Sequence, residues 1–164
     1  MTDLHLTAAT AADLVKISNE IMDCWSWVPL IRFEEAKQEL VIPMAIYDYD
    51  IRHGETVSWL GLRRHWSVSV HSSSLRIRNV SRWMVKPDRP KQHMWIGNIR
   101  WSDGKMTLHG GAVDIVATAS AIDVSLDVEG GEIGRLKARH LFGVDQYRED
   151  PAHPYSEGSW ALAE

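Results

Sequence analysis

The chain has one cysteine and two phenylalanines in 164 residues, and no long apolar run. With Cys24 alone no intramolecular disulfide can form, so packing must stabilise the fold. No uninterrupted apolar stretch approaches the roughly 18 residues that a membrane helix needs. The first residues also lack the basic and apolar regions of a secretory signal peptide. We therefore expect a soluble, cytoplasmic protein without a membrane partner.

Charge is unevenly distributed along the chain, although the net charge is only −4. Residues 1–51 hold three basic and nine acidic side chains, and residues 106–164 hold four basic and ten acidic ones. The centre, residues 52–105, holds eleven basic and three acidic ones. Such a pattern serves an anionic ligand, or it is self-complementary within one copy or between copies. We favour self-complementarity, because net negative charge opposes loose binding of polyanions and argues against a nucleic-acid partner.

The N-terminal part shows helical periodicity. Thr10 with Asp13 resembles a capping box, and apolar residues then recur at helical spacing as far as Val28, where Pro29 follows. A second, shorter helix is expected over 33–40, before Pro43. Residues 44–51 alternate apolar and acidic side chains and predict a strand that ends in a turn at His53-Gly54.

Alternating strands dominate the rest. Residues 66–71 and 75–78 predict a hairpin around the serines at 72–74, and Asp103-Gly104 is a preferred two-residue hairpin turn. The second turn sets Trp101 opposite Met106 and Ile99 opposite Leu108 on the buried face. Trp95 is expected to join that face, with a bend at Gly97 between Trp95 and Ile99. Arg100, Thr107 and His109 then lie on the outer face.

A third hairpin is predicted around Gly130-Gly131. A bulge at Gly134 would pair Leu126 with Leu136 and Ile122 with His140. That register places an imidazole on an apolar face, and it makes His140 the most interesting candidate for proton transfer.

Together these patterns predict an α+β fold dominated by β structure. One or two N-terminal helices pack on a curved antiparallel sheet of about eight strands, which forms a barrel or a sandwich. We expect a single domain over 1–164, with a helical segment at 1–43, the β block at 44–142 and an irregular arm at 143–164.

No motif with a known mechanism is present. The eight histidines include no His-x-x-x-His or His-Glu-x-x-His pair, so no metal site is predicted, and no cofactor motif is found. Whether the protein is an enzyme stays open. Two functions from different classes fit the sequence.

The first is a non-catalytic protein-interaction module, or a subunit of a larger assembly or homo-oligomer. The charge segregation and the absence of a catalytic motif favour it. In this interpretation Arg76 and Arg78, on the outer face of their strand, are candidate ligand-binding residues for an anionic group.

The second is a small cofactor-free enzyme of the isomerase or lyase type, or a carrier, that holds a small hydrophobic molecule in a cavity. The expected cavity lining consists of Trp95, Trp101, Met106 and Phe142. Proton transfer would fall to His140, with Asp48, Asp50 or Tyr47 as its partner. The eight tryptophans supply such a lining, although Trp as ordinary core is the more common arrangement.

Overall fold

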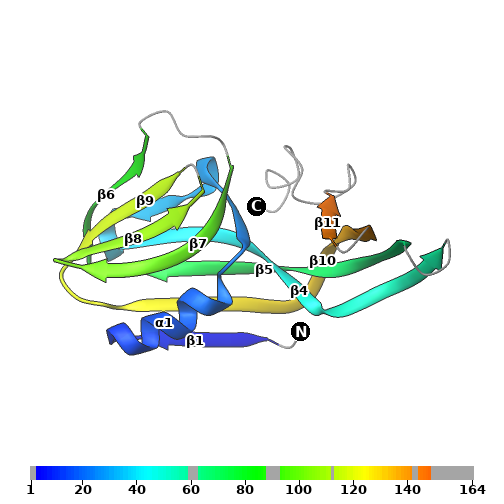
Figure 1. Cartoon of the computed structure of the whole chain (residues 1–164). Helices are drawn as coiled ribbons and strands as arrows, with labels where there is room; N and C mark the ends of the chain where they lie inside the picture. Colours follow the sequence, from blue (N-terminus) through cyan, green and yellow to red (C-terminus); the bar gives the residue numbers. More distant parts are fainter. Residues whose placement is uncertain (1–2, 59–62, 88–92, 112, 142–143, 149–164) are drawn as a thin grey trace.

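The computed structural model describes residues 3–58, 63–87, 93–111, 113–141 and 144–148 (Figure 1). These residues form one α-helix, two short 3-10 helices and eleven strands. Their bounds are α1 (Ala11–Glu20), η1 (Val28–Leu30), η2 (Glu35–Lys37), β1 (Leu4–Ala8), β2 (Cys24–Trp27), β3 (Arg32–Glu34), β4 (Glu39–Ser58), β5 (Arg63–Ile77), β6 (Val80–Lys86), β7 (His93–Ser102), β8 (Lys105–Gly110), β9 (Asp114–Ala119), β10 (Val124–Leu141) and β11 (Val144–Arg148).

All strands belong to one antiparallel sheet in the order β1-β10-β5-β4-β2-β7-β8-β9-β6, with β11 paired to β10 and β3 to β4. The sheet does not close, because its terminal strands β1 and β6 do not pair with each other. It folds over so that β1-β10-β5-β4 and β7-β8-β9-β6 make two layers joined by the short strand β2 (Figure 1). The predicted mainly-β α+β class is confirmed.

The main core lies between these layers, and α1 packs against β1 and β7 at its side. Leu75 and Leu126 from one layer and Met106 and Ile115 from the other are fully buried. Ile17 of α1 joins the same cluster with no exposed surface. Burying side chains of this size stabilises the fold by about 1.5–3 kcal/mol each.

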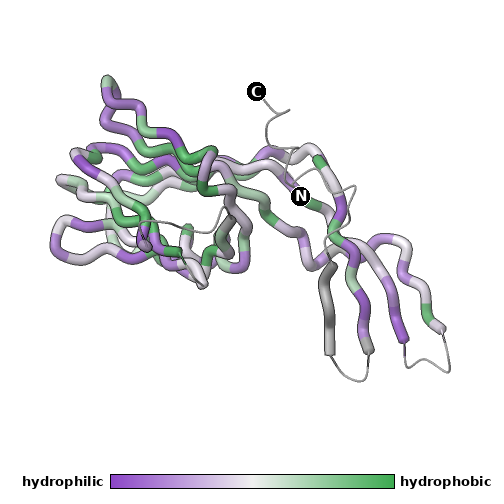
Figure 2. Tube along the Cα trace, turned by 90° about the horizontal axis from the view of Figure 1, so that it is seen from above, coloured by the Kyte–Doolittle hydropathy of each residue, from purple (hydrophilic) through white to green (hydrophobic). Residues whose placement is uncertain are grey.

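The three longest strands, β4, β5 and β10, run out of the two-layered body and form an extension (Figure 2). Along β5, Leu75 and Ile77 enter the main core, whereas Val68 and Val70 enter a second apolar cluster with Leu136. Odd and even positions of a strand face opposite sides. The extra residues at the register shifts lie in β4 and β10, so the alternation along β5 is uninterrupted. The two clusters are therefore on opposite faces of one sheet.

Helix α1 is shorter than predicted. Thr10 is its N-cap and accepts a hydrogen bond from the Asp13 amide, as the capping pattern predicts. The helix ends at Glu20, however, and β2 follows with backbone pairs to both β4 and β7. The expectation of helix as far as Val28 is wrong, because pairing between two strands outweighs the apolar spacing.

The second predicted helix, over 33–40, is also wrong. Only the three-residue η2 is helical there, and Gln38 takes a left-handed conformation (φ 50°) that ends it. Strands β3 and β4 pair on either side of this turn. The segment 1–43, predicted as helical, therefore holds one α-helix and strands β1, β2 and β3 in addition to the start of β4.

The hairpin at Asp103-Gly104 is confirmed. Both turn residues have positive φ (51° and 72°), and Trp101 pairs with Met106 and Ile99 with Leu108. Trp95, in contrast, is on the other face and 42% exposed. The register shift between Ile96 and Asn98, at the Gly97 bend, reverses the alternation, so that Ile96 is buried in place of Trp95.

The turns predicted at 72–74 and at Gly130-Gly131 are wrong, since β5 and β10 each pass straight through them. Leu126 pairs with Leu75 and Leu136 with Val68, because β10 lies along β5 over both halves. The glycines instead fall in a register shift between Val128 and Glu132, and a further shift precedes Gly134.

Two further predicted turns or irregular segments are strand. His53-Gly54 lies inside β4, where Gly54 has a φ of 61°, at a register shift between His53 and Thr56. In the arm that was expected to be irregular, Val144–Arg148 forms β11. The rest of that arm from 149 onward, with Gly143, lies outside the described residues.

Candidate functional site

The outer face of β6, β9 and β8 is set by strand alternation. Ile115, Ala117, Met106 and Leu108 point into the main core with no exposed surface, so their neighbours point outward. The strand registers arrange these outward residues in three rows across the sheet. The rows are Arg82–Thr118–Lys105, Met84–Val116–Thr107 and Lys86–Asp114–His109.

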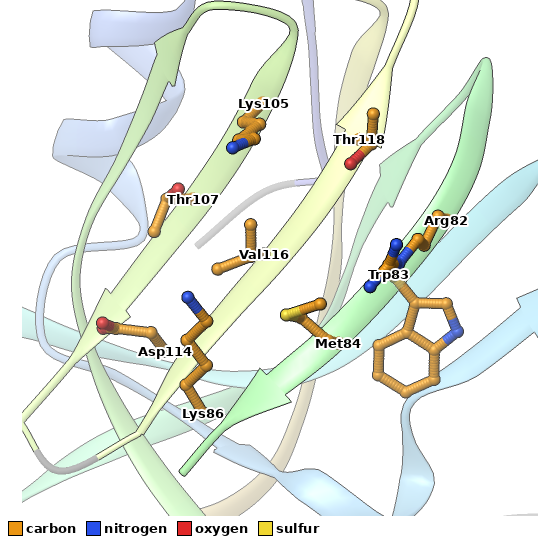
Figure 3. Close-up of a pocket in the computed structure, with 9 residues that line it drawn as sticks. All are labelled: Arg82, Trp83, Met84, Lys86, Lys105, Thr107, Asp114, Val116 and Thr118. Atoms are coloured by element: carbon orange, nitrogen blue, oxygen red, sulfur yellow. The ribbon is translucent and has the colours of Figure 1, made fainter. Parts of the chain in front are cut away.

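The residues of these rows other than His109, together with Trp83, line a groove of about 420 Å³ (Figure 3). Met84 and Val116 supply its apolar floor, and the hydroxyls of Thr107 and Thr118 lie beside them. Arg82, Lys86 and Lys105 are placed around this floor. Arg100 of β7 pairs with Thr107 and extends the middle row by one strand. The arrangement offers cations and hydroxyl donors above an apolar base, which is suited to a ligand that carries carboxylates or other anionic groups.

The four cations of this face have no ion-pair partner among the residues that the structure describes. We call Arg82, Lys86, Arg100 and Lys105 the basic face. The one carboxylate in the groove, Asp114, lies 3.2 Å from Nδ1 of His109. A ligand that reaches the basic face would therefore displace no ion pair among the described residues.

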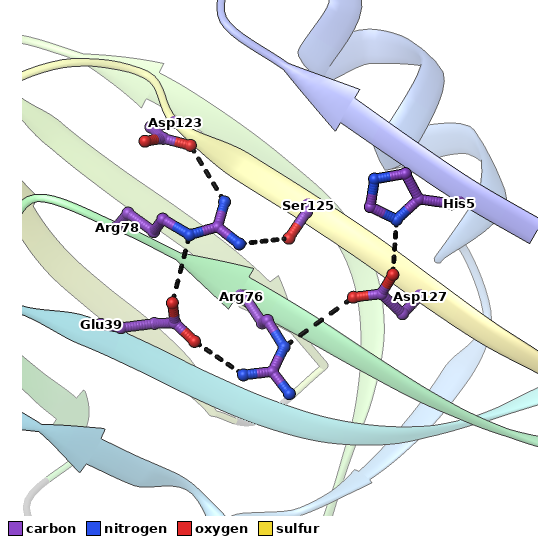
Figure 4. Close-up of polar contacts among 7 residues, drawn as sticks. All are labelled: His5, Glu39, Arg76, Arg78, Asp123, Ser125 and Asp127. Atoms are coloured by element: carbon purple, nitrogen blue, oxygen red, sulfur yellow. Dashed lines mark hydrogen bonds and ion pairs between the residues drawn. The ribbon is translucent and has the colours of Figure 1, made fainter. Parts of the chain in front are cut away.

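Arg76 and Arg78, by contrast, are bound to carboxylates within the chain (Figure 4). Glu39, which is buried, accepts from Arg76 Nη1 at 2.7 Å and from Arg78 Nε at 3.2 Å. Arg78 also donates to Asp123 and to Ser125, both at 3.2 Å. Self-complementary charge is therefore confirmed for this part of the basic centre, with acidic partners from both terminal thirds of the chain.

The outer edge of this network reaches β1. Asp127 lies 3.8 Å from Arg76 Nε and also contacts His5 Nδ1 (Figure 4). The two arginines that the sequence suggests as ligand-binding residues therefore already hold three carboxylates. An added anion at Arg76 or Arg78 would compete with these carboxylates, whereas on the basic face it would meet no such ion pair among the described residues.

Three of the four residues suggested for proton transfer line a second groove. Tyr47, Asp48 and Asp50 meet Glu20 and Asp23, from the end of α1 and the turn after it, around a volume of about 240 Å³. The groove is acidic.

His140 is elsewhere, in the extension. Its register partners are Arg64 and Asp145, so the predicted pairing with Ile122 is wrong. Strand alternation places His140 on the same face as Leu136 and Ala138 of the second apolar cluster, not on the face of the main core. Asp48 pairs with Ser69 of β5, whereas His140 pairs with Arg64 of the same strand. These two partners are five residues apart, which separates them by about 17 Å at 3.3 Å per residue.

The expected apolar cavity does not assemble from its described members. Met106 is fully buried in the main core, and Trp101 packs against that core. Trp95 lies on the opposite face, where its ring centroid is 5.9 Å from that of Tyr47. Phe142 lies outside the described residues.

The sequence interpretation missed one polar cluster, in the extension. Ser69 Oγ donates to Glu132 Oε2 at 2.6 Å and lies 2.8 Å from His53 Nε2. Arg135 donates to the other oxygen of Glu132 at 2.8 Å, and these two hydrogen bonds, from Arg135 first and then from Ser69, hold the pKa of Glu132 below its usual value.

This cluster differs from a catalytic triad, in which the histidine stands between the hydroxyl and the carboxylate. Here Ser69 stands between His53 and Glu132, and Ser69 is only 6% exposed. Because the members come from three strands, no linear motif marks them. We interpret the cluster as the polar connection between β4, β5 and β10.

The groove on β6, β9 and β8 was only partly accessible to sequence reasoning. The charge count places its cations in the basic centre, and the Asp103-Gly104 register puts Arg100, Thr107 and His109 on the outer face. What the sequence does not indicate is that β6 pairs with β9, which brings Arg82 and Lys86 next to that face.

No group of three or more His, Cys, Asp or Glu side chains in the described part of the chain is arranged to hold a metal ion. Nor does any helix within the described ranges have the length and apolar character needed to cross a membrane. Comparisons with protein-family models, curated proteins and solved structures give no match. The case for a function therefore depends on the geometry of the grooves.

Proposed function

We propose that this chain is a non-catalytic protein-interaction module that binds an acidic segment of a partner protein on its basic face. One observation carries the proposal. Arg82, Lys86, Arg100 and Lys105 share one outer face without ion-pair partners among the described residues, while Arg76 and Arg78 are matched by carboxylates.

The chemistry of the groove defines the ligand class. An ion pair with one exposed cation contributes at most about 1 kcal/mol to binding. Four such cations therefore support a modest affinity that weakens with salt. Thr107 and Thr118 add hydroxyl donors for carboxylate oxygens. Met84 and Val116 offer apolar contact for the carbon atoms of the same side chains.

The overall charge argues for a short acidic segment rather than a long polyanion. The chain carries a net charge of −4, and its acidic groove on β4 would repel an extended anion that reaches it. A protein segment with a few carboxylates contacts the basic face alone. Such charge complementarity sets the association rate and the choice of partner more than the affinity.

The alternative of a cofactor-free enzyme or carrier has less support. It requires His140 beside Asp48, Asp50 or Tyr47, and it requires Trp95 and Met106 in one cavity. The registers and burial described above separate both pairs.

The test uses fluorescein-labelled hexaglutamate as the probe, with fluorescence anisotropy at about 50 mM salt, where surface electrostatics are weakly screened. The variant Arg82→Gln/Lys105→Gln removes two charges from the basic face. Its matched control, Lys16→Gln/Lys37→Gln, removes two exposed charges from other elements. Labelled hexalysine is the probe of opposite charge.

We expect the basic-face variant to bind hexaglutamate at least about tenfold more weakly, and the control variant to change by less than about twofold. Labelled hexalysine, titrated on its own, should bind the basic-face variant no more weakly than the unmodified protein. An equal loss in both variants would show that only net charge matters, and it would overturn the proposal. Failure of the unmodified protein to bind hexaglutamate at low salt would overturn it as well.

A further inference from the structure

Strand β6 is a free edge of the sheet next to the basic groove. Among the described strands it pairs only with β9, and it ends the strand order opposite β1 (Figure 1). An edge strand has main-chain N–H and C=O groups on its outer side that can pair with another strand. Within the described ranges, only Val80 at its start makes a backbone hydrogen bond outside the ladder, to Gln38 O at 2.9 Å.

The part of β6 suited to pairing is five residues long. The register with β9 is shifted between Val80 and Arg82, and it is then continuous from Arg82 to Lys86. Pro87 follows and cannot donate a main-chain hydrogen bond. Arg82–Lys86 is thus a short, regular edge with defined ends, close to the mean length of a strand.

The side chains of this edge alternate between two environments. Arg82, Met84 and Lys86 face the groove, and Trp83 also belongs to its lining (Figure 3). Trp83 and Val85 are partly buried and pack against the main core. A strand added beside β6 would place its own alternate side chains next to each of these two sets, at cross-strand separations of about 5 Å.

We propose that the acidic partner segment binds by adding a strand to the β6 edge, an inference that rests on the proposed function. The five residues opposite Arg82–Lys86 then follow a defined pattern. Acidic residues stand opposite Arg82 and Lys86, an uncharged residue opposite Met84, and apolar residues opposite Trp83 and Val85. Main-chain hydrogen bonds hold the segment, and the basic face selects its charge.

Strand addition would also select the order of residues in the bound segment, which the groove alone does not. A shallow basic surface attracts any short anion, with no preference for the order of residues along it. Addition to an edge fixes the spacing and the face of every side chain in the segment, because the side-chain period of a strand is two. The same carboxylates moved by one residue would point toward Trp83 and Val85.

The test keeps the protein unchanged and varies the peptide. The probe is a fluorescein-labelled peptide with the core Glu-Val-Thr-Val-Glu between Ser-Gly flanks. Its matched control, Val-Glu-Thr-Glu-Val, has the same composition and charge with the two faces exchanged. Two further peptides carry N-methyl groups, one on both valines and the other on the glutamates and the threonine.

We expect the face-exchanged peptide to bind at least about tenfold more weakly. One of the two N-methylated peptides should lose binding by a similar factor and the other by less than about twofold, because only every second amide of an added strand faces β6. Amide hydrogen exchange of Arg82–Lys86 should slow when the first peptide is bound.

Equal binding of all four peptides, with unchanged exchange in β6, would overturn strand addition. If those peptides still compete with hexaglutamate and lose affinity in the Arg82→Gln/Lys105→Gln variant, the basic face would stand as the binding surface without the edge. No binding by any acidic peptide would overturn the function itself, so the two failures are distinguishable.

Discussion

Glu39 accepts a 2.7 Å hydrogen bond from Arg76 at a position where its own side chain is almost completely buried. The pair joins the acidic first third of the chain to its basic centre, and Arg78 shares the same carboxylate. The network turns part of a segregated charge pattern into a structural element. What is left over, on β6, β7 and β8, is the charge that we assign to binding.

Loss of the Glu39 carboxylate should destabilise the fold. In Glu39→Gln two guanidinium groups lose their shared charged acceptor, and a charged hydrogen bond of this kind contributes about 1.5–3 kcal/mol. We expect a loss of about 2 kcal/mol in the free energy of unfolding, measured by urea denaturation. Glu34→Gln, which breaks an exposed pair with Lys37, should shift the urea midpoint much less than Glu39→Gln does. Equal effects of the two substitutions would contradict the structural role of Glu39.

The hairpin turn at Asp103-Gly104 depends on backbone conformation. Gly104 has a φ of 72°, which a side chain disfavours, so Gly104→Ala should destabilise the protein by about 1–2 kcal/mol. Asp103→Asn serves as the control, since asparagine suits the first position of this turn, and it should change stability by less than about 0.5 kcal/mol. Thermal unfolding of both variants checks the prediction, and an unaffected Gly104→Ala would argue against this turn.

The Glu132 carboxylate gives the extension a defined pH dependence. Its pKa is lowered in the fold by Arg135 and then by Ser69, so its stabilising effect is present above its ordinary pKa of 4.5 and is lost as the pH falls through the lower folded value. Glu132→Gln should therefore be less stable than the unmodified chain near neutral pH, by less than about 1 kcal/mol because the group is exposed. The difference should shrink below about pH 4.5.

Urea midpoints of the two proteins at several pH values measure this difference. Arg135→Gln removes the largest cause of the lowered pKa and should reduce the pH dependence of the difference. If the difference in unfolding free energy between Glu132→Gln and the unmodified chain is constant with pH, ionisation of Glu132 does not contribute to stability.

The thiol of Cys24 should be inert in the folded protein. Burial raises its pKa well above the usual range, and the nearby carboxylates of Asp23 and Glu20 raise it further. Because the thiolate is the reactive form, alkylation by iodoacetamide at pH 8 should be at least about tenfold slower in buffer than in urea. Fast labelling of the native chain would show that the main core is open at β2.

The sequence predicts local features of this fold well and long-range pairing poorly. The Thr10 cap and the Asp103-Gly104 register are confirmed, because each depends on residues within a few positions of one another. The turns expected at 72–74 and at Gly130-Gly131 are wrong, because β5 and β10 satisfy each other's main-chain groups along their whole length. Glycines and serines that favour a turn lie instead within paired strands or at register shifts.

The same distinction applies to the candidate site. Sequence alone identifies the basic centre but not which of its cations are matched, since Glu39, Asp123 and Asp127 come from distant segments. Nor does it indicate that a shift at Gly97 moves Trp95 to the opposite face from Trp101. Both outcomes follow from strand register. Register is set by contacts between strands that are distant in the sequence, so local sequence patterns do not predict it.

The most direct test of binding on the basic face is a nuclear magnetic resonance titration of the uniformly labelled protein with hexaglutamate at low salt. We expect the largest amide shift changes on the groove strands, at Lys86, Lys105, Thr107, Val116 and Thr118, while Arg76 and Arg78 change little. Changes that centre on Arg76 and Arg78 instead, with the groove unaffected, would contradict the assignment of the basic face as the binding surface.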